Sequence, residues 1–169
     1  MPYREKKIYS GNQLEVGIYN ISFRDRKQPR ARKEKLTVPK QQNLNHKNAV
    51  RHLIRLLNTN FTNKDIVIYL TYSQKNLPDS EEQAKRDVRN YIRRVQRYRK
   101  KKGLPELKYI AVVEYREATA GKKEVRMHHH IVMSGMDRDV VEELWGKGRA
   151  NADRLKADEY GYEGLARYI

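Results

Sequence analysis

The chain has no cysteine, which excludes disulfide bonds, a thiolate nucleophile and cysteine-type zinc sites. It also lacks any apolar run that approaches the roughly 20 residues of a membrane-spanning helix. The N-terminal sequence MPYREKKIYSG has no hydrophobic segment of the kind found in signal peptides. We therefore expect a cytoplasmic protein with no membrane partner. The length of 169 residues predicts a single domain, 1–169, that buries a real core.

Acidic residues are the minority among the charged ones. Lysine and arginine number 37 against 21 aspartates and glutamates, which gives a net charge of +16. Such a charge predicts a polyanionic partner, most simply nucleic acid, bound in a salt-dependent way and in place of a small-molecule substrate. A merely soluble surface is the alternative interpretation.

A basic N-terminal region covers about residues 1–40. Residues 14–23, LEVGIYNISF, alternate as a strand should. The sequence RDRKQPRARKEK follows and predicts a loop or hairpin tip that reaches a phosphate backbone, although a solvated loop fits equally well. The candidate DNA contacts in it are Arg24, Arg26, Lys27, Arg30 and Arg32.

The rest of the chain alternates between helical and strand patterns. Apolar residues at three- and four-residue spacing predict helices, and runs of β-branched residues predict strands. The predicted helices are 45–61, 77–103, 137–148 and a last one within 158–169, and the predicted strands are 65–73, 106–117 and 125–133. This order favours an α+β fold, in which helices cover one face of a mainly antiparallel sheet and the other face is free for a site.

The last predicted strand, VRMHHHIVM, contains three consecutive histidines. Successive side chains of a strand point to opposite faces. His128 and His130 therefore share one face, and His129 lies on the other with Ile131 and Met133, which we expect to be the core side.

The preceding strand can supply a third ligand. Glu114 closes the apolar run KYIAVVEYR, one hairpin turn before the histidines. If the register places Glu114 on their face, two imidazoles and a carboxylate can hold a divalent ion with positions left open, as a catalytic metal needs. Mn²⁺ and Mg²⁺ suit this mixed set, as do Co²⁺ and Zn²⁺. The alternative is that all three are ordinary surface residues.

A metal beside a basic surface suggests work on a phosphodiester, whose oxygen it would polarise. The nucleophile would be metal-bound water, a serine or one of the twelve tyrosines. Residue spacing does not choose among them.

Four segments resemble motifs of the HUH endonucleases. HHH, 128–130, is similar to their His-hydrophobe-His motif, and IYLTYS, 68–73, to their first motif. VVEYRE, around Glu114, resembles the segment that carries an acidic third ligand, and GLARYI, 164–169, resembles the helix of the nucleophilic tyrosine. The motifs occur in the family's order, from about residue 60 to the end. Within the superfamily they resemble the rolling-circle replication initiators of plasmids, phages and integrated elements.

The resemblance implies a metal-dependent nickase of single-stranded DNA at a replication origin. His128, His130 and Glu114 would hold the ion, with Glu117 as the fallback third ligand. Tyr168 would attack the scissile phosphate, become linked to the 5′-phosphate and free a 3′-hydroxyl for rolling-circle replication.

The resemblance also implies a fold and partners. The fold would be the ferredoxin-like or RRM-like sheet of that family. Tyr69, Thr71 and Arg126 would contact DNA. The partners would be an origin strand, with a hairpin or adjacent duplex, and a host helicase and polymerase.

The sequence departs from the family pattern in three places. A histidine stands at position 129 instead of a hydrophobic residue; if buried, it must be neutral and hydrogen-bonded, and a register slip of one residue would instead make it a ligand. The usual lysine one helical turn after the tyrosine is absent because the chain ends at Ile169. We expect a domain truncated before further residues; the alternative is a chain that lacks a group that would help to position DNA or balance charge. Gly164 occupies the place of a second tyrosine, which predicts a single-tyrosine enzyme with Tyr160 and Tyr162 as packing residues.

Two other functions fit the sequence. One is a conjugative relaxase or single-tyrosine transposase, although relaxases commonly use a third histidine. The other is a non-catalytic module that binds single-stranded nucleic acid through stacked tyrosines and a basic helix.

Overall fold

The computed structural model describes residues 3–21, 38–119, 121 and 123–169. The chain divides into two compact units, 1–60 with 158–168 and 61–157 with Ile169, and each is described by itself. Whether residues 1–169 behave as one domain stays a prediction. The predicted DNA contacts from Arg24 to Arg32 lie outside the described residues.

The first unit consists of a β-hairpin and two helices. Strands β1 (Tyr3–Ser10) and β2 (Gln13–Asn20) pair antiparallel, and the two helices are α1 (Pro39–Asn60) and α4 (Glu163–Tyr168). Only one strand was predicted here, and it was placed at 14–23.

Asn58 of α1 contacts both the hairpin turn and the segment that precedes α4. Its side-chain Oδ1 accepts a hydrogen bond from the Tyr162 amide at 2.9 Å. Its carbonyl oxygen lies so close to Gly11, at the hairpin turn, that a Cβ there would be 2.1 Å away. Gly11 also has a φ of +56°, so only glycine suits this turn.

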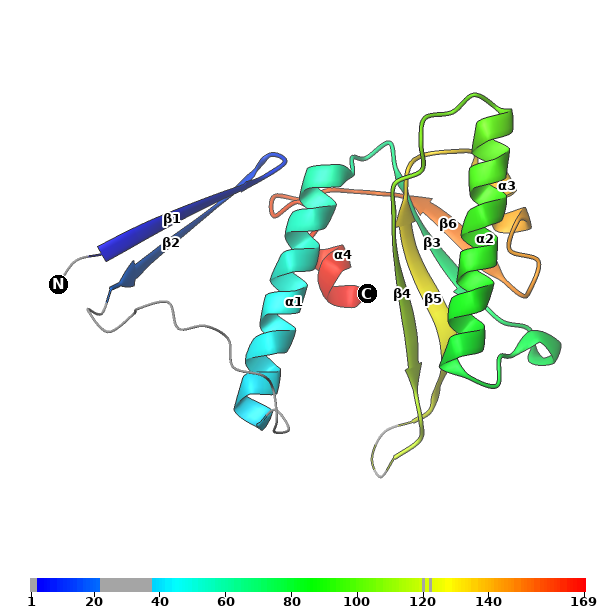
Figure 1. The fold of residues 1–169 in the computed structure, drawn as a ribbon, viewed down its shortest axis with the longest axis horizontal. Coiled ribbons are helices and arrows are strands. Elements are labelled where there is room, and N and C mark those ends of the chain that lie inside the picture. The colour runs from blue at the N-terminus through cyan, green and yellow to red at the C-terminus, as the bar shows by residue number, and fades with distance from the viewer. Residues whose placement is uncertain (1–2, 22–37, 120, 122) are drawn as a thin grey trace. The chain divides into compact units, whose positions relative to one another are not determined.

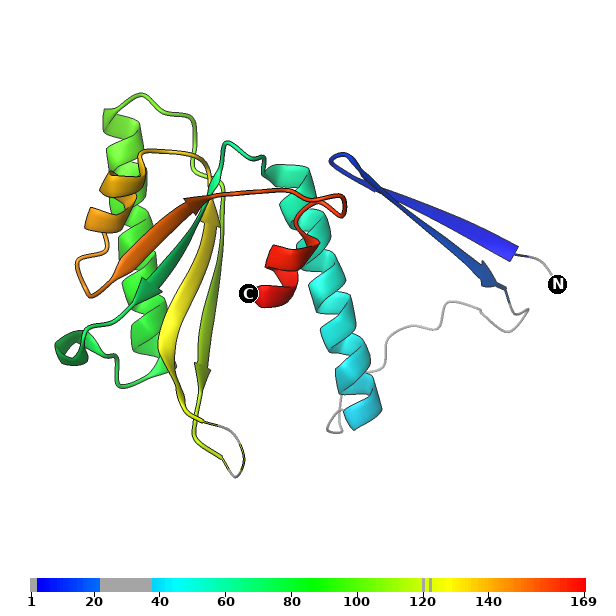
Figure 2. The same cartoon turned by 180° about the vertical axis from the view of Figure 1, so that it is seen from behind.

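The second unit contains a four-stranded antiparallel sheet in the order β4-β5-β3-β6. Helix α2 covers one face of the sheet (Figures 1 and 2). This arrangement confirms the predicted α+β fold. The elements of this unit are β3 (Ile66–Thr71), the 3-10 helix η1 (Gln74–Asn76), α2 (Glu81–Lys101), β4 (Tyr109–Arg116), β5 (Val125–Met133), α3 (Arg138–Glu143) and β6 (Ala150–Arg154).

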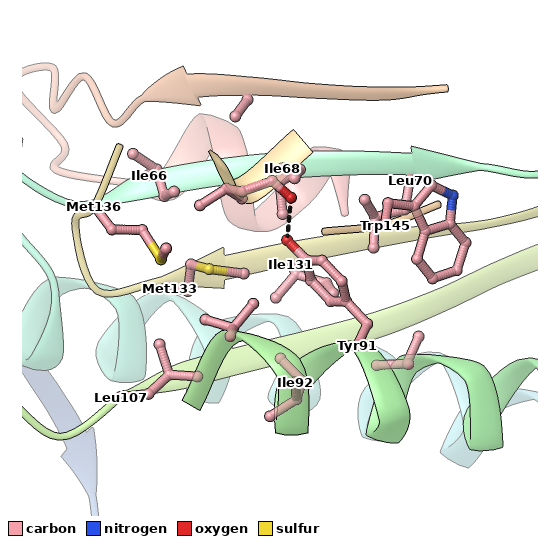
Figure 3. Close-up of a cluster of buried hydrophobic side chains, with 14 of the residues drawn as sticks. Ile66, Ile68, Leu70, Tyr91, Ile92, Leu107, Ile131, Met133, Met136 and Trp145 are labelled. Atoms are coloured by element: carbon pink, nitrogen blue, oxygen red, sulfur yellow. Dashed lines mark hydrogen bonds between the residues drawn. The ribbon is translucent and has the colours of Figure 1, made fainter. Parts of the chain in front are cut away.

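The core of this unit lies between the sheet and α2 (Figure 3). Ile66, Ile68 and Leu70 alternate along β3 and are fully buried. They pack with the apolar stripe of α2, in which Tyr91 also donates a hydrogen bond to the Val141 carbonyl at 3.0 Å. The side chains of even-numbered residues in β5 thus lie on the face of the sheet opposite α2.

Helix α2 begins and ends as predicted. The Ser80 hydroxyl accepts a hydrogen bond from the Gln83 amide at 3.2 Å, which caps the N-terminus. Gly103, with φ of +65°, follows the C-terminus in the left-handed conformation that glycine favours.

Two predictions about the elements were wrong. Strand β6 was not predicted, because ANADR is short and polar. Helix α3 spans only six residues of the predicted 137–148, although Val141 and Trp145 face the core as expected. Among the described residues, no helix combines the length and apolar character needed to cross a membrane.

Candidate metal centre

The strand register brings Glu114 to the two outward histidines. In the β4–β5 pair, Glu114 lies opposite His128, and Val112 lies opposite His130. Residues opposite each other in a ladder project from the same face. The expected shared face is therefore confirmed.

The three side chains converge on one point. Glu114 Oε2 lies 3.2 Å from His128 Nε2 and 3.1 Å from His130 Nε2. One ligand atom from each residue lies within 4.8 Å of the others. His130 is buried while 45% of the Glu114 side chain is exposed, so the cluster is shielded from solvent at His130 and accessible at Glu114.

The hydrogen bonding of His128 suits a cation at this point. Its Nδ1 lies 2.8 Å from the Arg126 carbonyl oxygen, which can only accept. Nδ1 therefore carries a proton, so in the neutral tautomer that binds a metal the lone pair is on Nε2, the atom that faces Glu114. Burial lowers the pKa of His130, which likewise favours the neutral, ligating form. The donor set thus fits a divalent metal ion.

His129 points the other way, into the core. It is fully buried, and its Nε2 lies 2.8 Å from the Tyr72 hydroxyl. Burial lowers the pKa of His129 to about 4, so the ring is neutral. The expectation of a neutral, hydrogen-bonded His129 is confirmed.

The predicted DNA contacts Tyr69 and Thr71 lie on the metal face of the sheet. Tyr69 is opposite His130 in the β3–β5 register, and their rings meet edge to face at 5.4 Å. Thr71 is opposite His128, and its hydroxyl donates to the Arg149 carbonyl at 3.1 Å. Arg126 is exposed and donates to Gln74 Oε1 at 3.1 Å.

Glu117 does not belong to the cluster that the described residues form. It lines a cleft of about 540 Å³ together with Ser80 and Glu81, at the start of α2. The structure therefore favours Glu114 over the fallback ligand.

The three C-terminal tyrosines differ in exposure. Tyr168, the last residue of α4, is 65% exposed, and Tyr160 is 62% exposed. Tyr162 is buried, as predicted for a packing residue, whereas the same prediction for Tyr160 was wrong.

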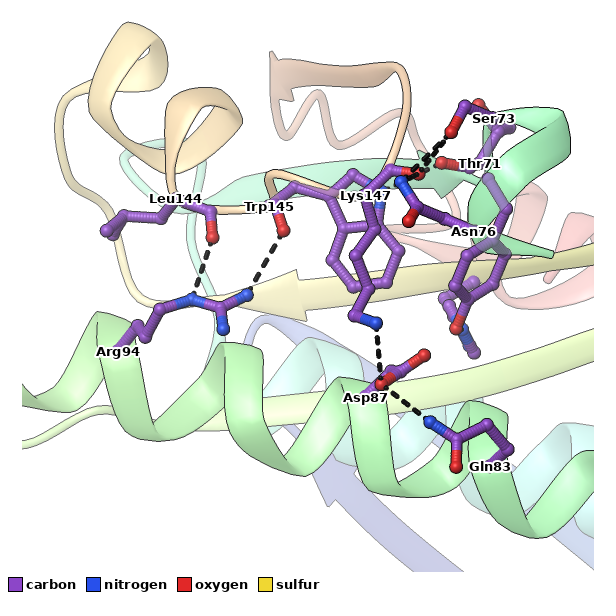
Figure 4. A network of polar contacts seen from close by, with 11 residues as sticks. Thr71, Ser73, Asn76, Gln83, Asp87, Arg94, Leu144, Trp145 and Lys147 are labelled. Carbon is purple, nitrogen blue, oxygen red and sulfur yellow. Dashed lines mark hydrogen bonds and ion pairs between the residues drawn. The ribbon is translucent and has the colours of Figure 1, made fainter. Parts of the chain in front are cut away.

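Sequence reasoning missed a buried ionic pair beneath the sheet. Asp87 of α2 is 3% exposed, lies 3.1 Å from Lys147 Nζ and accepts a hydrogen bond from Gln83 (Figure 4). The available signal was an acid at a core position of an apolar stripe, between Ala84 and Val88. A buried acid of this kind needs a partner.

An antiparallel sheet that presents two histidines and a glutamate to one point defines a class of α+β protein with a candidate divalent-metal site. Residues 65–169, well over half of the chain, match the family described as replication-associated protein ORF2/G2P, and the chain belongs to this family. Membership supports a replication-associated role and an interaction with DNA. No curated protein and no solved structure matches the chain.

Proposed function

We propose that the chain initiates replication by nicking single-stranded DNA at an origin, as a metal-dependent endonuclease and strand transferase. The observation that carries this proposal is the convergence of Glu114, His128 and His130 on one point, in a member of a replication-associated family. A cluster of this composition has open coordination positions for substrate.

Glu114 Oε2 and the Nε2 atoms of the two histidines would hold Mn²⁺ or Mg²⁺. When bound, the ion would act as a Lewis acid on a phosphodiester oxygen. The Arg126 carbonyl orients His128 for this role through Nδ1. Tyr69 and Thr71 form the neighbouring surface on which DNA would lie.

Tyr168 is the proposed nucleophile. Its phenolic oxygen attacks the scissile phosphorus, a bond forms from that oxygen to phosphorus, and the bond from phosphorus to the 3′-oxygen breaks. A free phenol has a pKa of about 10 and so keeps its proton at neutral pH. This proton must therefore be lost before or during the attack. The 3′-oxygen leaves as a hydroxyl that can prime synthesis. One phosphodiester replaces another, so a 3′-hydroxyl can reverse the step.

A covalent-adduct assay tests this function. The chain is incubated with Mn²⁺ and overlapping single-stranded oligonucleotides that tile the DNA on both sides of its coding sequence, each labelled at the 3′ end. Because the 5′-phosphate stays on the protein, the label should migrate with the protein in a denaturing gel.

Tyr168→Phe should abolish this adduct without loss of binding. Tyr160→Phe is the matched control, since Tyr160 is similarly exposed in the same segment, and it should form the adduct at the original rate. Binding without an adduct on every oligonucleotide would favour the non-catalytic binding module instead. An adduct that survives Tyr168→Phe would contradict the choice of nucleophile.

A further inference from the structure

A second charged surface lies on the outer side of α2, away from the metal centre. Every third or fourth residue from Arg86 to Lys100 is basic and exposed. We call this set the α2 stripe; it consists of Arg86, Arg89, Arg93, Arg97 and Lys100.

The stripe is narrow and straight. At about 100° per residue, its five members fall within an arc of about 80°. At about 1.5 Å per residue, it extends for about 21 Å along the helix. The centre of this arc is opposite the side of α2 that packs on the sheet through Val88, Tyr91 and Val95.

The acids of α2 leave most of the stripe without a neutralising charge, because only Glu82, one turn before Arg86, lies on the same face of the helix. Beyond Glu82 in the first turn, the only acid of α2 is Asp87, which is buried and paired with Lys147. No stripe residue forms an ion pair with a described carboxylate. Like charges three and four residues apart repel each other and destabilise a helix. A polyanion laid along the stripe would remove this repulsion.

We propose that the α2 stripe binds the backbone of duplex DNA. A DNA duplex presents one negative charge per about 1.7 Å of its axis, so its charge density exceeds that of the stripe along the whole length. Single-strand sites combine basic residues with exposed aromatic rings on which bases stack. The outer face of α2 has none, since Tyr91 is buried and Tyr98 is half-buried against the core.

The metal ligands project from the opposite face of the same sheet. In combination with the proposed nicking function, the stripe would hold the duplex that adjoins the single-stranded substrate. The proposal that the stripe binds duplex DNA depends only on the charge and geometry of α2. It would hold even if the chain did not cleave DNA.

Salt-dependent binding tests the stripe. The full chain is titrated by fluorescence anisotropy against a labelled blunt-ended duplex longer than the stripe, and against a single strand of equal length, over a series of salt concentrations. Replacing Arg89, Arg93 and Arg97 with glutamine should reduce the slope of log K against log salt by about 2 to 3, since each lost phosphate contact accounts for about 0.9. Duplex affinity should fall about tenfold or more at low salt, and single-strand affinity much less.

Two variants serve as controls. Replacing three exposed lysines outside the stripe, Lys64, Lys108 and Lys156, with glutamine removes the same charge and should leave most of the slope intact. Arg93→Gln alone should reduce the slope by about 0.9, which gives a second measurement should the triple variant unfold.

An unchanged slope in the stripe variant, or an equal loss in the lysine variant, would overturn the proposed site. An equal loss of single-strand affinity would overturn the assignment to duplex. Adduct formation on a bare single strand by the unaltered chain is measured alongside, because its failure would count against the nickase and not against the stripe.

Discussion

At the scale of single residues, the Tyr72 hydroxyl is the only side-chain hydrogen-bond partner of the His129 ring among the described residues. The hydroxyl lies 2.8 Å from His129 Nε2. Either tautomer of the ring can use this contact, since Nε2–H can donate to the hydroxyl and an Nε2 lone pair can accept from it. His129 Nδ1 has no hydrogen-bond partner among the described residues. The central histidine is therefore held as part of the core, and it is not a ligand.

Removing that hydroxyl should destabilise the fold more than removing another buried one. Tyr72→Phe leaves both buried ring nitrogens of His129 without a hydrogen-bond partner among the described residues, and we expect a loss of about 2 kcal/mol in the free energy of unfolding. Tyr91→Phe, in the same core, removes only a hydrogen bond to the Val141 carbonyl and should cost about 1 kcal/mol. Urea unfolding of both variants measures the difference. An equal or smaller loss in Tyr72→Phe would contradict the stabilising role that we assign to the hydrogen bond between Tyr72 and His129.

The residues of the candidate site could be predicted from the sequence because they depend on local rules. Strand alternation separates His128 and His130 from His129, and a short hairpin places Glu114 within reach. The hydrogen-bond partner of His129 could not be predicted. Tyr72 follows β3 and reaches His129 through the long-range pairing of β3 with β5, which no local pattern encodes.

At the scale of elements, the sequence predicts those that bury an apolar face. Helix α2 has a cap, an apolar stripe and a terminating glycine, and β3 is a buried strand. Strands β1 and β6 were missed because most of their residues are exposed on both faces, so the alternation of apolar and polar residues is lost.

The pairing of β2 with α1 should depend on pH. Arg55 donates to both carboxylate oxygens of Glu15, at 3.0 and 2.7 Å. These hydrogen bonds lower the pKa of Glu15 from its usual 4.5 in the folded state. The pair therefore stabilises the fold at pH values above about 4.5, and this contribution is lost as the pH falls through the lowered pKa.

Comparison of the chain with Glu15→Gln tests this expectation. The variant should unfold at a lower urea concentration at pH 7, and the difference should shrink as the pH falls below about 4.5 and disappear below the lowered pKa of Glu15. Glu5→Gln is the control, because Glu5 is an exposed acid of β1 whose ion pair with Lys7 lies on the surface, and it should change stability by less than about 0.5 kcal/mol. A Glu15→Gln difference that persists unchanged at acidic pH would contradict the role of this carboxylate.

At the scale of the whole molecule, the net charge of +16 predicts the class of partner but not where it binds. The candidate binding surfaces are located by the fold. Packing α2 on one face of the sheet leaves the metal ligands on the other face and turns the α2 stripe outward. A sequence pattern gives the faces of one helix or strand, whereas the assignment of each face to core or solvent follows from tertiary packing.

The whole chain should become more stable when it binds metal. Glu114, His128 and His130 all belong to the second unit, so an ion that binds only the folded state should raise its melting temperature. At a Mn²⁺ concentration one hundred times Kd the gain is about 2.7 kcal/mol, or on the order of 10 °C for a unit of this size.

Glu114→Gln should remove most of this shift in melting temperature, because it takes away the anionic ligand. Glu117→Gln removes the same charge from an exposed residue outside the cluster and should keep the shift. Differential scanning fluorimetry with and without Mn²⁺ measures all three proteins, and a shift lost only in Glu117→Gln would move the third ligand to that residue.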